Sequence, residues 1–337
     1  MDRKIMCAGI AALCAAFAAL GDIYMAGDST MCNYNPRQYP QQGWGQALAV
    51  FMKDPGQLHN RAVGGRSARS FKNEGRWQKL VDDLKEGDWV VIAFGHNDAN
   101  KAKAERYSSV PDYKEIMAGF VRDARAKNAN VVFATSIPHA GGFSEDGEGK
   151  MHVRGGAAGI GPYVQATVEL GAELGVPVLD LNKFACENLP QLGIKEALRL
   201  YMRIEPGEYA NCPNGKSDKC HTRDTGAYFY ARAAVKMARE LGLGICSHFK
   251  AQKDVVFTPI PREGPGAKAQ PMKDDFSAEE IPYANEEAAN KEGAVVADWQ
   301  KEILNLRREG RRNGMTDEDA KKWAAQEFHR RHDGKKQ

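Results

Sequence analysis

The chain has 337 residues, which is enough for one large α/β domain and an appendage, and its 42% hydrophobic and 27% charged residues are typical of a globular protein. The formal net charge of +3 is too small to indicate anionic lipid or nucleic acid as a partner. No cluster of Lys and Arg is interleaved with aromatic residues, so we expect no nucleic-acid partner.

Residues 1–21 predict a secretory signal peptide. Arg3 and Lys4 precede an uncharged apolar run from Ile5 to Leu20, and small residues near its end supply a cleavage zone. A membrane anchor or a buried helix is the alternative, but the run is short for a spanning helix. We therefore expect a secreted or periplasmic protein without an integral membrane segment in the mature chain.

Residues 22–250 alternate short apolar runs with helical patterns, as parallel βαβ units do. The runs predict strands at 23–26, 59–63, 89–94, 131–134 and 176–179. Apolar residues recurring at intervals of three and four predict helices over 44–52, 77–84, 113–127, 161–174 and 225–241. Because ligands bind outside the carboxyl ends of such strands, the residues just after each strand are the candidates for chemistry.

The segment Gly27-Asp28-Ser29-Thr30 follows the first predicted strand. A serine at a strand-to-helix turn is exposed, and the backbone N–H groups of the following helix stabilise negative charge. A helix cap or the phosphate-binding loop of a flavodoxin-like sheet would have the same sequence. Ser29 is therefore a candidate nucleophile that needs partners elsewhere in the chain.

Two further segments after predicted strands provide candidate donors for an oxyanion. Gly65 permits a close approach of the backbone, and Asn97, in Gly95-His96-Asn97-Asp98, can supply a side-chain amide. A tetrahedral oxyanion needs several such preorganised donors. For His96 itself we expect a structural role.

Asp218 and His221 stand three residues apart in what we predict to be a loop before the last helix of the domain. At this spacing the carboxylate can reach the imidazole Nδ1–H while Nε2 faces a serine. Taken by itself, this motif has an alternative explanation, because Asp and His often stand three residues apart by chance.

Five cysteines remain after the predicted signal peptide, namely Cys32, Cys186, Cys212, Cys220 and Cys246. Cys212 and Cys220 flank a turn-rich segment, and we expect them to form a disulfide because export exposes thiols to oxidising conditions. Two free thiols in a packed loop are the alternative. No C-x-x-C pair is present, and we predict no metal site.

The composition changes near Lys250. Five prolines and little apolar periodicity predict a linker or an extended wrap over 251–285. Residues 286–337 predict short amphipathic helices, one of them capped by Thr316 with Asp319 completing a T-x-x-D box.

The order Ser29, Gly65, Asn97 and His221 resembles the four sequence blocks of the SGNH (GDSL-like) hydrolase superfamily. Within it, G-D-S-T, G-W-G-Q, G-R-S-A-R-S-F, F-G-H-N-D and D-x-x-H are similar to the rhamnogalacturonan acetylesterases and related carbohydrate deacetylases. The resemblance covers residues 23–243. It implies a flavodoxin-like three-layer α/β/α sandwich with a parallel sheet, to which this chain adds a C-terminal helical appendage.

The resemblance also implies roles for the site residues. Ser29 would be the nucleophile, His221 the base and Asp218 the orienting acid. The backbone N–H groups of Ser29 and Gly65, with the amide of Asn97, would form the oxyanion hole.

The resulting prediction is a serine esterase, a carboxylic ester hydrolase that acts through an acyl-Ser29 intermediate and uses no cofactor. Its expected substrate is an O-acetyl ester of a plant cell-wall polysaccharide, pectin/rhamnogalacturonan or xylan. Arg66 and Arg69 are candidates for pairing with a uronate carboxylate, or else they brace a loop. A GDSL-type lipase or thioesterase and a non-catalytic flavodoxin-like binding module are the alternatives.

Overall fold

The computed structural model describes residues 21–257, 259 and 260, and isolated positions between 309 and 327. The predicted signal peptide and most of the predicted linker and C-terminal extension lie outside these residues. Export therefore stays a prediction, which amino-terminal sequencing of the exported protein tests. The predicted cap is observed, since Thr316 Oγ1 accepts a hydrogen bond from Asp319 N at 3.2 Å and lies 2.7 Å from Asp319 Oδ2.

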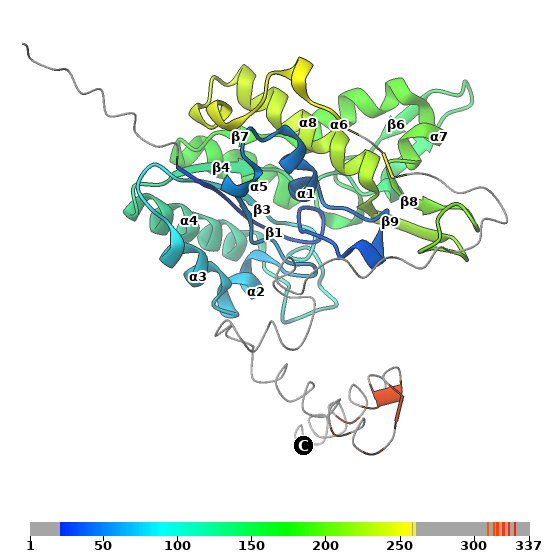
Figure 1. Cartoon of the computed structure of the whole chain (residues 1–337), viewed down its shortest axis with the longest axis horizontal. Helices are drawn as coiled ribbons and strands as arrows, with labels where there is room; N and C mark the ends of the chain where they lie inside the picture. Colours follow the sequence, from blue (N-terminus) through cyan, green and yellow to red (C-terminus); the bar gives the residue numbers. More distant parts are fainter. Residues whose placement is uncertain are drawn as a thin grey trace, which may run out of the picture.

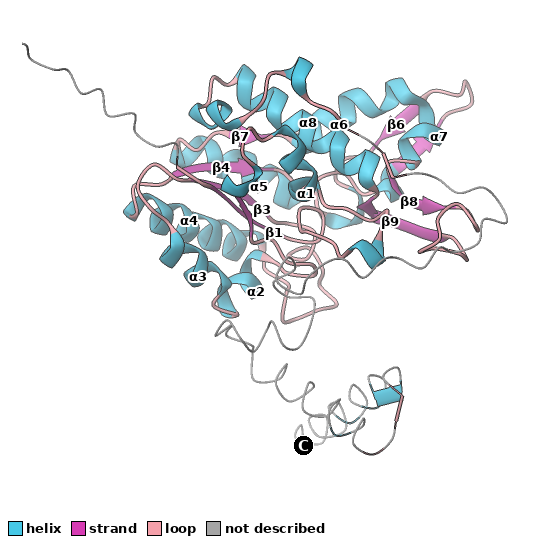
Figure 2. Ribbon diagram, viewed as in Figure 1, coloured by secondary structure: helices cyan, strands magenta, loops and turns pink. Residues whose placement is uncertain are grey.

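A five-stranded sheet forms the centre of the described structure (Figures 1 and 2). In spatial order its strands are β2 (Leu58–Asn60), β1 (Ile23–Gly27), β3 (Trp89–Ala93), β4 (Asn130–Ala134) and β7 (Val178–Leu179). All neighbouring strands are parallel. Numbered within this sheet alone, the order is 2-1-3-4-5, which is that of flavodoxin-like folds, and it confirms the predicted fold class.

Side chains of the central strands alternate between two hydrophobic cores. In β1, Ile23 and Met25 belong to one core, whereas Tyr24 and Ala26 belong to the other. Successive residues of a strand point to opposite faces, and both faces of this sheet are covered, so every residue of β1 is buried.

Two layers of helices enclose the sheet (Figure 1). One face packs against α1 (Trp44–Leu48), α6 (Leu181–Asn188) and α8 (Asp224–Glu240). The opposite face packs against α2 (Ala68–Asn73), α3 (Arg76–Asp83), α4 (Val110–Ala126) and α5 (Gly161–Leu174). The result is the three-layer α/β/α sandwich that the sequence predicts.

Two antiparallel hairpins and a short helix lie outside this sandwich. The first hairpin is β5 (Phe143–Glu145) with β6 (Met151–Val153), and the second is β8 (Tyr201–Ile204) with β9 (Lys216–Thr222). Helix α7 (Gly193–Leu198) precedes β8. The sequence patterns did not predict these elements, nor α2 and α6.

Each predicted strand and helix is present, in the predicted order, with three corrections of extent or type. The predicted strand 59–63 is β2, which ends at Asn60, and α1 ends at Leu48, where a 3₁₀ turn takes over. Asp218 and His221 lie in strand β9 and not in a loop, because this segment pairs with β8.

Arg223 fixes the β8–β9 hairpin to the body of the protein. Its fully buried guanidinium donates to the carbonyls of Tyr201 and Arg203, at 3.2 and 2.7 Å, and pairs with Glu208 at 2.8 Å. A buried ion pair that loses one partner leaves an uncompensated charge, so this contact holds the hairpin firmly. Arg223 comes two residues after His221, so the buried contacts of Arg223 also fix the position of the histidine.

The chain continues to pack on the domain beyond the predicted boundary at residue 250. The ring of Phe257 stacks on Tyr228 with 4.1 Å between centroids, and the backbone N–H of Ile260 donates to Asp224 Oδ2 at 2.6 Å. Both partners belong to α8. Phe257 and Ile260 therefore pack on the domain, as the wrap predicted for this segment would, whereas the predicted linker lies mostly outside the described residues.

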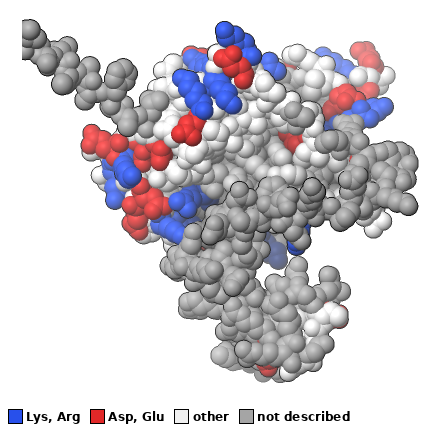
Figure 3. All heavy atoms as spheres, viewed as in Figure 1, with Lys and Arg blue, Asp and Glu red and all other residues white. Residues whose placement is uncertain are grey.

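The visible described surface mixes both signs of charge. In Figure 3, Lys and Arg side chains lie beside Asp and Glu side chains along the edge formed by α3 and α4. Within the part of the chain that the structure describes, no helix is both long enough and apolar enough to span a membrane.

Candidate active site

A cleft of about 600 Å³ opens where the central strands end and where β9 passes over them. Its size is that of a small-molecule site. The residues that line this active-site cleft are Ser29, Tyr34, Gln41, Gly64, Gly65, His96, Asn97, Ala99, Asn100, Lys101, Arg106, His139, Ala158, Ile160, Cys220 and His221. The four residues of the predicted Ser–Gly–Asn–His series thus come together from distant parts of the chain.

Ser29 lies in a tight turn directly after β1. The backbone N–H groups of Met31 and Cys32 donate to the carbonyl of Asp28, at 3.1 and 3.0 Å, and the hydroxyl of Tyr34 donates to the carbonyl of Ser29 at 2.7 Å. The expected strand-to-helix junction is therefore a strand-to-turn junction, and the next α-helix begins only at Trp44. The turn nevertheless holds Ser29 at the carboxyl end of β1.

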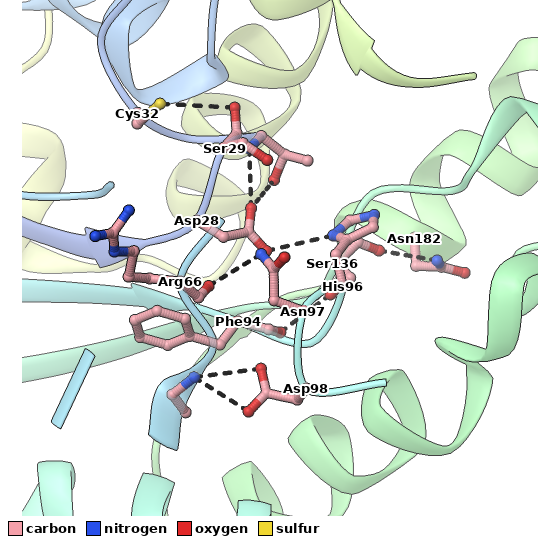
Figure 4. A network of polar contacts seen from close by, with 12 residues as sticks. Asp28, Ser29, Cys32, Arg66, Phe94, His96, Asn97, Asp98, Ser136 and Asn182 are labelled. Atoms are coloured by element: carbon pink, nitrogen blue, oxygen red, sulfur yellow. Dashed lines mark hydrogen bonds and ion pairs between the residues drawn. The ribbon is translucent and has the colours of Figure 1, made fainter. Parts of the chain in front are cut away.

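The carboxylate of Asp28 fixes this turn from below (Figure 4). It accepts hydrogen bonds from Thr30 N and Thr30 Oγ1, at 2.9 and 2.8 Å, and lies 3.5 Å from Nδ1 of His96. Burial acts to raise the pKa of Asp28, but the contacts with His96 and Thr30 outweigh it and hold the pKa below its ordinary value. Asp28 therefore stays ionised beneath Ser29. Apart from this contact, neither ring nitrogen of His96 has a hydrogen-bond partner among the described residues, and His96 lines the active-site cleft, so its expected structural role stays a prediction.

Gly65 lies in the loop after β2, beside Ser29. Its φ of +78° is strained for residues with a side chain, so the loop needs glycine here. A Cβ at the preceding Gly64 would lie 3.7 Å from Ser29 Cβ, which shows how closely the loop approaches the serine. The backbone N–H of Gly65 is thus in the neighbourhood where the oxyanion of an attacked ester would form.

Asn97 is held in place by the same loop. Its Nδ2 donates to the carbonyl of Arg66 at 3.1 Å, as Figure 4 shows. An amide nitrogen carries two hydrogens, so this contact orients the group and leaves one hydrogen for a ligand in the cleft. The next residue, Asp98, accepts from Ala68 N at 3.1 Å and so connects this loop to α2; burial raises its pKa to about 7.

We expect Asn97→Ala to lower kcat by roughly 10²- to 10³-fold, because loss of one oxyanion donor has this effect where it has been measured. KM should change little, since the donor acts mainly in the transition state. Steady-state kinetics on a small acetyl ester test this. A change in KM alone would mean that Asn97 only positions the substrate.

Asp218 orients His221 within strand β9. His221 Nδ1 and Asp218 Oδ2 are 2.7 Å apart, and Asp218 Oδ1 accepts from the backbone N–H groups of Cys220 and His221 at 2.8 and 3.1 Å. Partial burial acts to raise the pKa of Asp218, but the hydrogen bond and charge of His221 and the two N–H groups lower it well below its ordinary value. An ionised Asp218 keeps the proton on Nδ1 and leaves Nε2 as the basic nitrogen.

Sequence reasoning missed several residues that line the active-site cleft. His139 was expected on the surface but lines the cleft, and partial burial together with His96 lowers its pKa. Tyr34, Gln41, Lys101 and Arg106 also line it. Of these residues, only Lys101 and Arg106 could have been suspected from the sequence, because they stand in the same loop as Asn97.

Arg66 and Arg69, the candidates for contact with a uronate carboxylate, are not among the described residues that line the active-site cleft. Arg66 Nη1 donates to the carbonyl of Gly64 at 2.9 Å, and its Nε pairs with Glu74 at 3.1 Å. Arg69 pairs with Asp112 on α4 at 2.7 Å. Both arginines brace the loop and helix that follow β2, which was the alternative interpretation.

The predicted Cys212–Cys220 disulfide is wrong for this structure, since both cysteines are free thiols. Cys212 precedes β9 and packs beside Tyr209, whereas Cys220 lies near the other end of the strand. Burial raises the pKa of the Cys220 thiol well above its ordinary range, and that of Cys32 to about 12, so neither is a reactive thiolate.

Among the described residues, no group of three or more His, Cys, Asp and Glu side chains is arranged to hold a metal ion. The arrangement that is present consists of a hydroxyl, an imidazole with its carboxylate, and candidate oxyanion donors around one cleft. Such a set can transfer an acyl group to water.

Comparisons with known proteins agree with this arrangement. A model of the GDSL-like Lipase/Acylhydrolase family matches residues 25–195. The rhamnogalacturonan acetylesterase RhgT of Bacillus subtilis is 32% identical over 231 residues, which cover 68% of this chain and 95% of RhgT. A rhamnogalacturonan acetylesterase of Emericella nidulans is 44% identical over 137 residues, 35% of this chain and 53% of that protein.

A solved structure confirms the fold independently. The crystal structure of the protein YxiM of Bacillus subtilis is similar with a TM-score of 0.56 and 29% sequence identity. The similarity covers 66% of this chain and 57% of that chain.

Proposed function

Because the chain belongs to the GDSL-like lipase/acylhydrolase family and is a carboxylic ester hydrolase, we propose that it removes O-acetyl groups from a plant cell-wall polysaccharide such as pectin/rhamnogalacturonan or xylan. One observation carries the proposal. Ser29, Gly65, Asn97 and His221 come from four separate segments and line one cleft, with Asp218 holding the imidazole of His221.

In the proposed reaction, Ser29 Oγ attacks the carbonyl carbon of the acetyl ester while His221 Nε2 takes its proton. The oxyanion receives hydrogen bonds from the N–H groups of Ser29 and Gly65 and from the amide of Asn97. The C–O bond to the sugar then breaks, and His221 returns the proton to the departing sugar hydroxyl. Water, deprotonated by His221, attacks the acetyl-Ser29 ester and releases acetate.

The lining of the active-site cleft supports an acetyl group over a long acyl chain. Among the described residues that line it, the aliphatic ones are Ala99, Ala158 and Ile160, and most of the others are polar. A site for a long acyl chain would need an extended apolar surface. The carbohydrate part of the proposal is supported by the relatives, whose names describe rhamnogalacturonan acetylesterases. Family membership also favours hydrolysis over a role as a binding module.

A panel of esters tests this function. The purified protein should release acetate from acetylated polysaccharide. On nitrophenyl esters, kcat/KM should fall roughly tenfold or more from acetyl to octanoyl, because an acyl chain whose length the site does not match loses about this much in kcat/KM. A preference for octanoyl esters, with no acetate released from acetylated pectin or xylan, would support the lipase or thioesterase alternative instead.

A further inference from the structure

The active-site cleft carries positive charge near the candidate oxyanion hole. Lys101 and Arg106 line it, and none of the described lining residues is an aspartate or a glutamate. Of the carboxylates next to lining residues, Asp28 and Asp98 are buried, and Asp218 pairs with His221. A ligand entering this end of the cleft therefore meets two cations.

Arg106 lies directly against the loop that contains Gly65. Its Nη1 is 3.3 Å and its Nη2 3.7 Å from the point where a Cβ on Gly65 would be. Within the described part of the chain, the ion pair of Arg106 joins its Nε to Glu105 at 3.4 Å, and the Glu105 side chain is 61% exposed, so water screens that pair. Both terminal nitrogens lie near Gly65, and Arg106 lines the active-site cleft.

Lys101 supplies the second charge from the same loop. It is exposed and makes no ion pair with any described residue. A compact ammonium group of this kind attracts an anion without a fixed geometry, whereas the planar guanidinium of Arg106 can bind a carboxylate through two parallel hydrogen bonds.

The loop that carries both cations, residues 94–109 between β3 and α4, is held by its own hydrogen bonds. Asn100 N donates to Asn97 O at 3.2 Å, Arg106 N to Lys103 O at 2.9 Å, and Ser108 N to Asp98 O at 3.2 Å. The hydroxyl of Tyr163 on α5 donates to the carbonyl of Ser108 at 2.5 Å. A preformed loop binds a ligand at a lower entropic cost, and here it also contains Asn97.

We propose that Lys101 and Arg106 form a subsite for the carboxylate of a uronic acid in the substrate chain. The inference rests on the proposed function and narrows it, because it makes an acidic acetylated polysaccharide the preferred substrate over a neutral one such as xylan. The uronate lies at or next to the acetylated sugar, since the guanidinium of Arg106 lies against Gly65. This subsite replaces the one predicted at Arg66 and Arg69, whose guanidinium groups are held by Glu74 and Asp112.

The test compares three substrates of similar length: an acetylated oligogalacturonate, the same oligomer after reduction of its carboxyl groups, and an acetylated xylo-oligosaccharide. Acetate release gives kcat and KM at low and high salt. We expect the wild-type protein to prefer the charged oligomer, through a lower KM, and the preference to shrink at high salt. The double variant Lys101→Gln/Arg106→Gln should lower the ratio of kcat/KM between charged and reduced oligomer by about 10-fold or more.

Arg122→Gln/Lys127→Gln is the matched control. It also removes two exposed cations, from α4 and its C-terminal cap, and neither residue lines the cleft. This control should keep the wild-type ratio, and Arg106→Lys should keep part of it because the charge remains.

Three results would overturn the subsite. They are equal kcat/KM of the wild type on the charged and the reduced oligomer, an unchanged ratio in the double variant, and an equal loss of kcat on all three substrates. The last would assign the two cations to the oxyanion hole or to loop structure. A wild-type protein that releases acetate from no substrate, small esters included, contradicts the proposed function itself. That outcome is distinct from a failure of the subsite alone.

Discussion

Replacing Ser29 by alanine is expected to lower kcat on a small acetyl ester by on the order of 10⁴- to 10⁶-fold, because the hydroxyl that forms the acyl intermediate is lost. The backbone N–H of residue 29 and the rest of the cleft remain, so weak residual hydrolysis should persist. The turn around Ser29 is held by Asp28 and Tyr34 through its backbone, and thermal unfolding of the variant should match that of the wild type.

The matched control is Ser144→Ala, which removes an exposed serine on β5 outside the active-site cleft and should leave kcat unchanged. A serine-directed phosphonate should label the wild-type protein at Ser29, which peptide mass spectrometry locates. Labelling at another residue, or full activity of Ser29→Ala, would falsify the assignment of the nucleophile.

Asp218→Asn is expected to lower kcat by about 10⁴-fold, as amide replacement does in other triads. The hydrogen bonds of this residue give the reason. Oδ1 accepts two backbone N–H groups, so in the variant the amide oxygen keeps that position and the NH₂ group faces His221 Nδ1. His221 would then accept at Nδ1 and carry its proton on Nε2, where it cannot take the proton of Ser29.

A second Asp–His pair offers a control for this substitution. Asp146 and His152 meet at 2.7 Å in the β5–β6 hairpin, and neither lines the active-site cleft. Asp146→Asn should therefore leave kcat within about twofold of wild type, the size of effect that a lost exposed ion pair has. Nitrogen NMR of His221 in both variants reports the tautomer directly. A loss below tenfold in Asp218→Asn, with Nε2 still unprotonated, would show that another group orients the imidazole.

The central sheet was predictable because its strands are buried on both faces. Such strands appear as continuous apolar runs, of which W-V-V-I-A-F at Trp89–Phe94 is the clearest. The edge strand β2 contains His59 and Asn60 and is only partly buried, so its extent was misjudged. The order of the sheet followed from the family resemblance, since periodicity alone does not fix which strands pair.

The β8–β9 hairpin was not predictable from local pattern. Strand β9 reads K-S-D-K-C-H-T, with polar residues on both sides and most positions exposed or half-buried. It is a strand because β8 pairs with it and because Arg223 is anchored at its end, and both contacts depend on the tertiary structure. The spacing of Asp218 and His221 was informative nonetheless, because side chains three apart can meet in several backbone conformations.

The sequence also did not show which charged residues approach the active-site cleft. Arg66 and Arg69 are adjacent in sequence to Gly65, which made them natural candidates for substrate contact. Arg66 instead pairs with Glu74 at the end of α2, and Arg69 pairs with Asp112 on α4. Arg106 reaches Gly65 from 41 residues further along the chain, and no sequence pattern indicates that approach.

The wrap from Phe257 to Ile260 sets the boundary for shortened versions of this protein. A gene truncated after Lys250, where the composition changes, would remove the ring that covers Tyr228 and the N–H that donates to Asp224 at the start of α8. That helix begins three residues after His221, so the damage would reach the histidine that we propose as the base. A deletion intended to isolate the folded domain for expression or crystallisation should therefore retain every residue up to Ile260.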